Sequence, residues 1–241
     1  MKERVPEGLF RSIVRVKVND LVNKNKRAFD VAQFTSILQR KEVGGAEDVS
    51  ITFHTKAQQE LLKLWPPLRV KSLRLEFRRN QPVEKLPDLE VLQRFENLAV
   101  LDLNHYKFDN FGAPKLPQLQ GLKLSNCRSQ EQVGRWWTTS PHLKGLWEIG
   151  GTVLVKHLDQ LPASLEILQL AVKNEALDVS ALGRLKNLRV LSVSSIRPGS
   201  ERPILTNLPD LPQLRSLSLI RVGLSEDVPH SWQKALSNSD P

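Results

Sequence analysis

Leucine and other aliphatic residues recur along the chain in the pattern L-x-x-L-x-L, in which most x positions are polar. Seven segments carry this pattern, and successive segments begin 21 to 28 residues apart. They span residues 70–75, 98–103, 119–124, 143–148, 165–170, 188–193 and 214–219. Self-similarity at such a period predicts a repeat architecture, in which similar units stack along one axis.

Each segment is predicted to form one short β-strand. Its last two aliphatic residues are two positions apart, so both point to one side of a strand, while the residues between and after them point to the other side. Proline precedes several segments, as in Leu116-Pro117 and Leu208-Pro209, and fits a loop that leads into a sheet. One strand cannot bury its aliphatic side alone, so neighbouring units must pack against each other.

The seven segments and their lead-in loops resemble the leucine-rich repeat superfamily over roughly residues 68–224. The resemblance implies an α/β solenoid, with a curved parallel sheet on its concave face and short helices, 3-10 turns and loops on its convex face. The family pattern places Asn or Cys three residues after the third leucine, and only Cys127 matches it here. The subfamily is therefore unassigned. The repeat position predicts that Cys127 is a buried structural residue rather than a reactive thiol.

The chain on either side of the repeats is predicted to cover the two ends of the stack. The predicted units are an N-terminal cap or degenerate first repeats, the seven repeats, and a C-terminal cap with a tail, at residues 1–67, 68–224 and 225–241. Hydrophobic periodicity predicts short strands and helices in the first unit, at residues 10–18, 30–41, 49–53 and 56–65. The C-terminal cap contains Trp232 and Leu236.

The fourth repeat carries Glu148 where the other repeats have their third aliphatic residue. An ionised carboxylate buried without a partner costs several kcal/mol, more than the roughly 1.5 to 3 kcal/mol that a buried leucine contributes. We therefore expect the strand to bulge, so that Ile149 takes the core position while Trp147 and Glu148 lie at the binding face or its edge. Gly150-Gly151 gives the backbone the freedom for such an irregularity.

The resemblance also implies that a partner binds the concave sheet, on the residues that alternate with the core leucines. Large and charged residues occupy these positions in the first four repeats, and small ones follow in the last three. The candidate partner-binding residues are Arg74, Glu76, Asp102, Asn104, Lys123, Trp147, Glu148 and Gln169. We expect the contact to centre on Arg74, Asp102, Lys123 and a partly exposed Trp147, because Trp and Arg are typical of interface hot spots. The alternative is that these side chains only solvate the sheet.

The formal net charge of +9 is concentrated in the N-terminal third of the chain. Residues 1–85 hold 18 Lys and Arg against 10 Asp and Glu, a net charge of +8. Such a segment indicates either contact with nucleic acid or an anionic surface, or a solvated cap without a partner. It lacks the interleaved basic and aromatic residues of a groove for single-stranded nucleic acid. Nucleic-acid or anionic-surface binding is therefore the alternative to protein recognition.

Motifs of catalytic and cofactor-binding sites are absent from the sequence. It contains no GxSxG, P-loop, GxGxxG or HExxH motif, and its five histidines are scattered without ligand spacing. Its single cysteine excludes an intrachain disulfide framework and a zinc site of the CxxC type. We therefore predict a non-catalytic protein-protein recognition scaffold that uses no cofactor and no metal.

The same features indicate where the protein functions. A single cysteine favours a reducing compartment. The chain starts without an apolar leader, and no stretch approaches the roughly 18 apolar residues that a spanning helix needs. We therefore predict a cytoplasmic protein with no membrane span; a bacterial effector delivered into a host cell would have the same composition.

Overall fold

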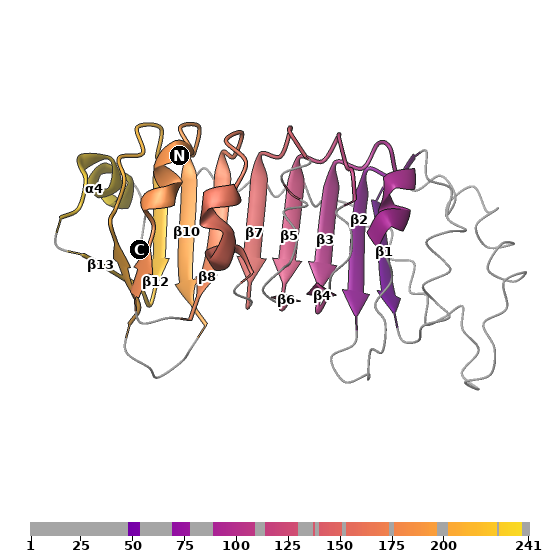
Figure 1. Ribbon diagram of the computed structural model, residues 1–241, viewed down its shortest axis with the longest axis horizontal. Coiled ribbons are helices and arrows are strands. Elements are labelled where there is room, and N and C mark those ends of the chain that lie inside the picture. Colours follow the sequence, from indigo (N-terminus) through magenta and orange to yellow (C-terminus); the bar gives the residue numbers. More distant parts are fainter. Residues whose placement is uncertain are drawn as a thin grey trace, which may run out of the picture.

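The computed structural model shows an α/β protein built on one large parallel sheet (Figure 1). The sheet has eight strands in the order β1-β2-β3-β5-β7-β8-β10-β12 and is open at both ends. The strands are β1 Asp48–Phe53, β2 Ser72–Phe77, β3 Val100–Asn104, β5 Gly121–Ser125, β7 Gly145–Ile149, β8 Ile167–Val172, β10 Val190–Ser195 and β12 Ser216–Ile220. The structure describes residues 48–53, 69–77, 89–108, 114–129, 137, 140–150, 153–173, 176–196, 202–225 and 227–237.

The strand pairing follows directly from the repeat pattern. The middle aliphatic residue of each repeat pairs with the same residue of the next repeat, so that one column of leucines crosses seven strands. This column consists of Leu73, Leu101, Leu122, Leu146, Leu168, Leu191 and Leu217, all of them buried. The seven predicted strands and their parallel arrangement are confirmed.

The sheet also includes a strand from the N-terminal unit. Strand β1 pairs in parallel with β2, and its partners run from Asp48↔Ser72 to Phe53↔Phe77. It covers the strand predicted at residues 49–53, so the sheet begins within the segment assigned to a cap or degenerate repeats. The strand predicted at residues 10–18 and the helices at 30–41 and 56–65 lie outside the described residues.

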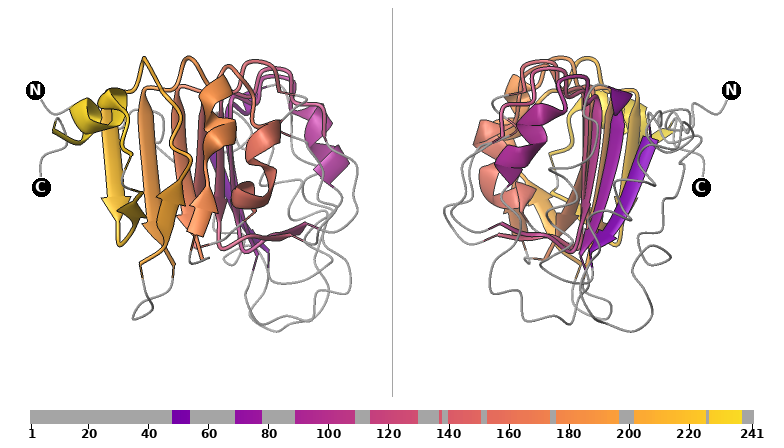
Figure 2. Two further views of the ribbon diagram at one scale, coloured as in Figure 1. Left: turned by 60° about the vertical axis from the view of Figure 1, so that its left-hand side comes forward. Right: turned by 90° about the vertical axis from the view of Figure 1, so that its right-hand side faces the viewer.

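Short elements return the chain from the end of one strand to the start of the next, on one side of the sheet (Figure 2). The 3-10 helices are η5 Leu89–Arg94, η7 Leu154–Gln160 and η8 Ser180–Arg184. Two small parallel sheets form on the same side, one from β4 Lys107–Phe108 and β6 Arg128–Ser129, the other from β9 Ala176–Asp178, β11 Ile204–Thr206 and β13 Gly223–Leu224. The other side of each strand therefore points away from these return segments.

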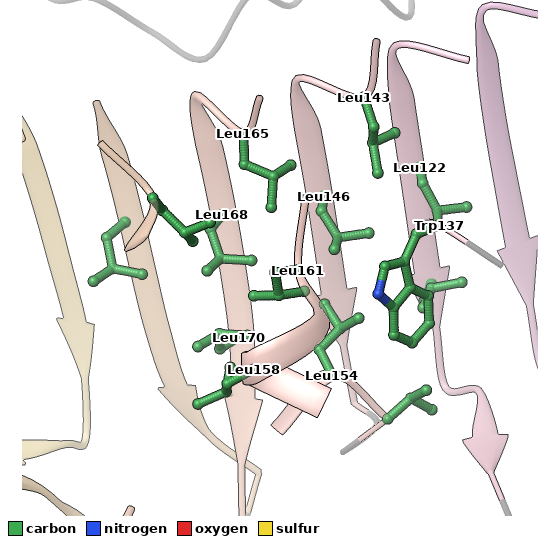
Figure 3. Close-up of a cluster of buried hydrophobic side chains, with 14 of the residues drawn as sticks. Leu122, Trp137, Leu143, Leu146, Leu154, Leu158, Leu161, Leu165, Leu168 and Leu170 are labelled. Atoms are coloured by element: carbon green, nitrogen blue, oxygen red, sulfur yellow. The ribbon is translucent and has the colours of Figure 1, made fainter. Parts of the chain in front are cut away.

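The hydrophobic core fills the space between the large sheet and the return segments. Figure 3 shows Leu122, Leu146 and Leu168 pointing from their strands toward Leu154 and Leu158 of η7. These five leucines are at most 5% exposed. Because each such leucine contributes about 1.5 to 3 kcal/mol when buried, the stacked columns are the main source of stability.

The C-terminal end of the core is covered by the helix α4 His230–Ser237, which packs against β12. Trp232 of this helix is fully buried, and its indole Nε1–H donates to the Pro209 carbonyl oxygen at 2.8 Å. The Ser231 hydroxyl donates to Asp210 Oδ1 at 2.7 Å on the same loop. Trp232 therefore joins α4 to the loop that leads into β12.

Tight turns follow four strands of the large sheet at equivalent positions. The residue directly after the strand has a positive φ in each case: His105, Asn126, Gly150 and Arg221. Its backbone also ties neighbouring repeats together, since the His105 amide donates to the Ser125 carbonyl and the Asn126 amide donates to the Ile149 carbonyl. Gly150 fits this position readily because glycine adopts a positive φ without steric cost.

Within the described part of the chain, no helix is long and apolar enough to cross a membrane.

Candidate recognition surface

The side of the large sheet that points away from the core is called the outer face here. Its middle row consists of the residues between the last two core positions of each repeat, and the strand register joins them into one line. The row reads Arg74, Asp102, Lys123, Trp147, Gln169, Ser192 and Ser218. Five of the predicted partner-binding residues therefore lie side by side, as the repeat pattern predicted.

A second row on the outer face lies two residues further along each strand. The register pairs Glu76 with Asn104, and Ser125 with Ile149, so Ile149 and not Glu148 occupies the outer face of β7. Ile149 is 41% exposed, as expected for an outer position. The predicted bulge, with Ile149 in the core and Glu148 on the binding face, is wrong.

Glu148 instead keeps the core position of its repeat. It pairs with Leu124 of β5 in an unbroken register, and it is fully buried. Its carboxylate accepts hydrogen bonds from the backbone amides of Val153 and Leu154, at the start of η7. These donors satisfy the buried carboxylate, and so the strand does not have to be distorted to remove it from the core.

Burial is also the main influence on the ionisation of Glu148. It raises the pKa of Glu148 from 4.5 to about 7, because the charged form loses its hydration. The backbone hydrogen bonds from Val153, Leu154 and Ala171 lower this pKa but do not offset the burial. Glu148 is therefore a structural residue that changes its charge near neutral pH, and it is not available to a partner on the outer face.

Trp147 lies on the outer face but is only 7% exposed. Its indole covers two glycines: a Cβ built on Gly145 would come within 2.1 Å of Trp147 Cη2, and one on Gly121 within 3.4 Å of Cζ3. The ring thus occupies the space that side chains would take at two neighbouring strand positions. The partly exposed Trp147 expected from the sequence is not observed. The signal that could have revealed its position is the pair of glycines at the same position in two successive repeats.

Three charged side chains form a network beside Trp147. Arg74 Nε lies 2.9 Å from Asp102 Oδ2, and Lys123 Nζ lies 3.9 Å from the same oxygen. Asp102 is only 4% exposed, and this burial raises its pKa, while the charges of Arg74 and Lys123 oppose the increase. The network links β2, β3 and β5.

The other half of the outer face is small, polar and uncharged in its middle row. Gln169 and Ser192 are half-buried, and Ser218 is exposed. At the end of β12, Ile220 is 55% exposed. Sequence reasoning did not include Ile149 and Ile220 among the candidate contacts, although the strand alternation would place Ile220 on this face.

The described residues contain no cluster suited to metal binding, and the cysteine is structural. No group of three or more His, Cys, Asp or Glu residues in the described part of the chain could hold a metal ion. Cys127 is buried, and its thiol donates to the Leu103 carbonyl oxygen at 3.3 Å. Burial raises the pKa of Cys127 to about 12, so the thiolate that a nucleophile requires is not formed near neutral pH.

Comparison of the sequence with protein-family models and with curated proteins finds no match. The candidate surface is therefore defined by the repeat pattern and the strand register alone.

Proposed function

We propose that the chain is a leucine-rich repeat solenoid that recognises another protein through the outer face of its sheet and catalyses no reaction. The observation that carries this proposal is the middle row, in which seven residues from seven repeats form one line across the sheet. At about 4.8 Å between strands, the line is about 29 Å long. A standard protein interface of about 800 Å² per partner has similar dimensions.

The arrangement of the row supports recognition by a surface that is already ordered. Arg74 and Lys123 each pair with Asp102, and the Trp147 indole packs over Gly121 and Gly145. Fixing side chains before the partner arrives lowers the entropic cost of association. In this proposal the charged network selects the partner, and the small side chains in the neighbouring uncharged half of the face allow the partner to pack closely against the sheet.

Binding of nucleic acid or an anionic surface is the second candidate, and the net charge of +8 in residues 1–85 favours it. Phosphate contacts release counterions, so such binding weakens steeply as the salt concentration rises. Titration of a labelled single-stranded oligonucleotide at low and high salt measures this directly. Absence of binding at low salt would remove this candidate.

Site-specific photo-crosslinking tests which side of the sheet binds the partner. We expect a crosslinkable amino acid at Ser192 or Ser218 to capture a distinct partner from a cell extract, because both positions lie in the middle row. Lys156 and Asp159 are exposed on η7, on the opposite side of the sheet, and serve as matched controls. Mass spectrometry identifies the captured protein. Equal capture from η7 and from the middle row would contradict the proposal.

A further inference from the structure

A second line of residues crosses the sheet at the edge where its strands begin. For the six strands from β3 to β12 in the large sheet, the residue directly before the strand donates its backbone amide to the carbonyl oxygen of the equivalent residue in the preceding repeat, at 2.7 to 2.8 Å. This line, called the strand-start row, consists of Lys71, Ala99, Gln120, Lys144, Glu166, Arg189 and Arg215. Its continuous hydrogen bonding makes it a rigid support for the side chains that it carries.

The strand-start row is rich in exposed cations. Four of its seven residues are Lys or Arg, and all four are exposed. Lys144 and Arg189 share Glu166: Lys144 Nζ lies 3.5 Å from Oε1, and Arg189 Nη1 lies 3.6 Å from Oε2. Arg215 forms no ion pair within the described residues.

The four residues at one end of the row therefore carry an excess of positive charge. Lys144, Glu166, Arg189 and Arg215 occupy adjacent repeats and have a net charge of +2. The side chains of Lys144 and Arg189 remain 61% and 51% exposed beside Glu166, so they can contact a second anion. The single carboxylate of Glu166 cannot pair with all the N–H donors of Lys144, Arg189 and Arg215.

We propose that Lys144, Arg189 and Arg215 bind an acidic segment of the partner protein, with Glu166 setting the spacing of its carboxylates. The inference rests on the proposed function and names the chemistry of the partner. It predicts carboxylates on the partner opposite the three cations, and a neutral or basic residue opposite Glu166. Charge complementarity of this kind increases the association rate and determines which partners are accepted.

The surroundings of the row favour a protein segment over nucleic acid. The proposed site itself contains a carboxylate, because Glu166 lies between Lys144 and Arg189 and pairs with both. A phosphate backbone is negative throughout and is repelled by this carboxylate, whereas a protein segment can vary its charge from residue to residue. Sequence-tolerant binding of single strands also uses exposed aromatic rings, and Trp147 is nearly covered.

The test is the binding of a labelled peptide of Asp and Glu residues, measured by fluorescence anisotropy at about 50 mM salt. We expect Arg189→Gln combined with Arg215→Gln to weaken binding by about tenfold or more. Lys156→Gln combined with Lys234→Gln removes the same charge from exposed positions on η7 and α4, and should change the affinity less than about twofold. Circular dichroism checks that both variants remain folded.

A third variant tests the sign of the effect. Glu166→Gln removes the carboxylate shared by Lys144 and Arg189, so it should strengthen peptide binding. Equal weakening by the two arginine substitutions and the two control substitutions would show that only net charge matters, and would overturn the inference. So would a failure of the peptide to bind, or an oligonucleotide that binds more tightly and loses affinity in the same arginine variant.

This experiment separates the inference from the proposed function. If a partner is captured at Ser192 and Ser218 but binds the arginine variant at the unchanged rate and affinity, the acidic segment is refuted and the proposed function stands. If the peptide depends on the strand-start row but no partner is captured from the outer face, the proposed function fails while the anion-binding row remains.

Discussion

Glu148→Gln is expected to stabilise the protein at about pH 8 by up to about 3 kcal/mol. The folded state holds the Glu148 proton up to a pKa of about 7, against 4.5 for the ordinary side chain. Between these values the folded protein binds more protons than the unfolded chain, so the free energy of unfolding of the wild type falls as the pH rises. Glutamine carries no charge, so the variant should lose this dependence. Its single amide oxygen can accept from only one of the Val153 and Leu154 amides, which donate to different carboxylate oxygens, and the lost hydrogen bond reduces the net gain.

Urea unfolding at about pH 5 and about pH 8 measures the effect. The stability of the variant relative to the wild type should rise by about 2 to 3 kcal/mol from the lower to the higher pH. Glu96→Gln, at an exposed position, is the matched control and should leave the difference between the two pH values unchanged. A difference between the variant and the wild type that is the same at both pH values would contradict the raised pKa of Glu148.

Trp232→Ala is expected to lower the free energy of unfolding by about 3 to 5 kcal/mol. The indole is fully buried between α4 and the last repeat, so its removal leaves a large cavity and also loses the hydrogen bond to Pro209. Trp232→Phe keeps most of the packing and should lose less. A loss below about 1 kcal/mol for the alanine variant would show that α4 does not protect this end of the core.

The strands could be predicted from the sequence because their cause is local. Two aliphatic residues two positions apart define the buried side of a strand, and repetition of this pair defines its neighbours. The same alternation placed Arg74, Asp102 and Lys123 in one row. Position alone therefore determined the order and register of these residues on the outer face.

Two features of the candidate site depended on contacts that no local pattern contains. The burial of Glu148 is possible because the Val153 and Leu154 amides meet its carboxylate, and the direction of these amides depends on the path of the following turn. The covering of Trp147 depends on Gly121, which belongs to another repeat. Both features involve partners that only the folded chain brings together.

The residues of the strand-start row can be identified in the sequence, but the sequence does not show that they form one line. Its residues occupy the second position of each repeat, and Lys71, Lys144, Arg189 and Arg215 are evident in the printed chain. Only the backbone ladder shows that these positions form one rigid line with Glu166 between two cations. Residues 68–224 hold 22 Lys and Arg against 15 Asp and Glu, and the structure shows where some of these cations collect.

The most direct test of the account is the affinity of the captured partner for a variant with Ser192→Arg and Ser218→Arg. Both substitutions place bulky side chains in the middle row and leave the buried leucines untouched. We predict that this variant binds the partner at least about tenfold more weakly while its free energy of unfolding stays within about 0.5 kcal/mol of the wild type. Unchanged affinity in a fully folded variant would contradict recognition through the outer face.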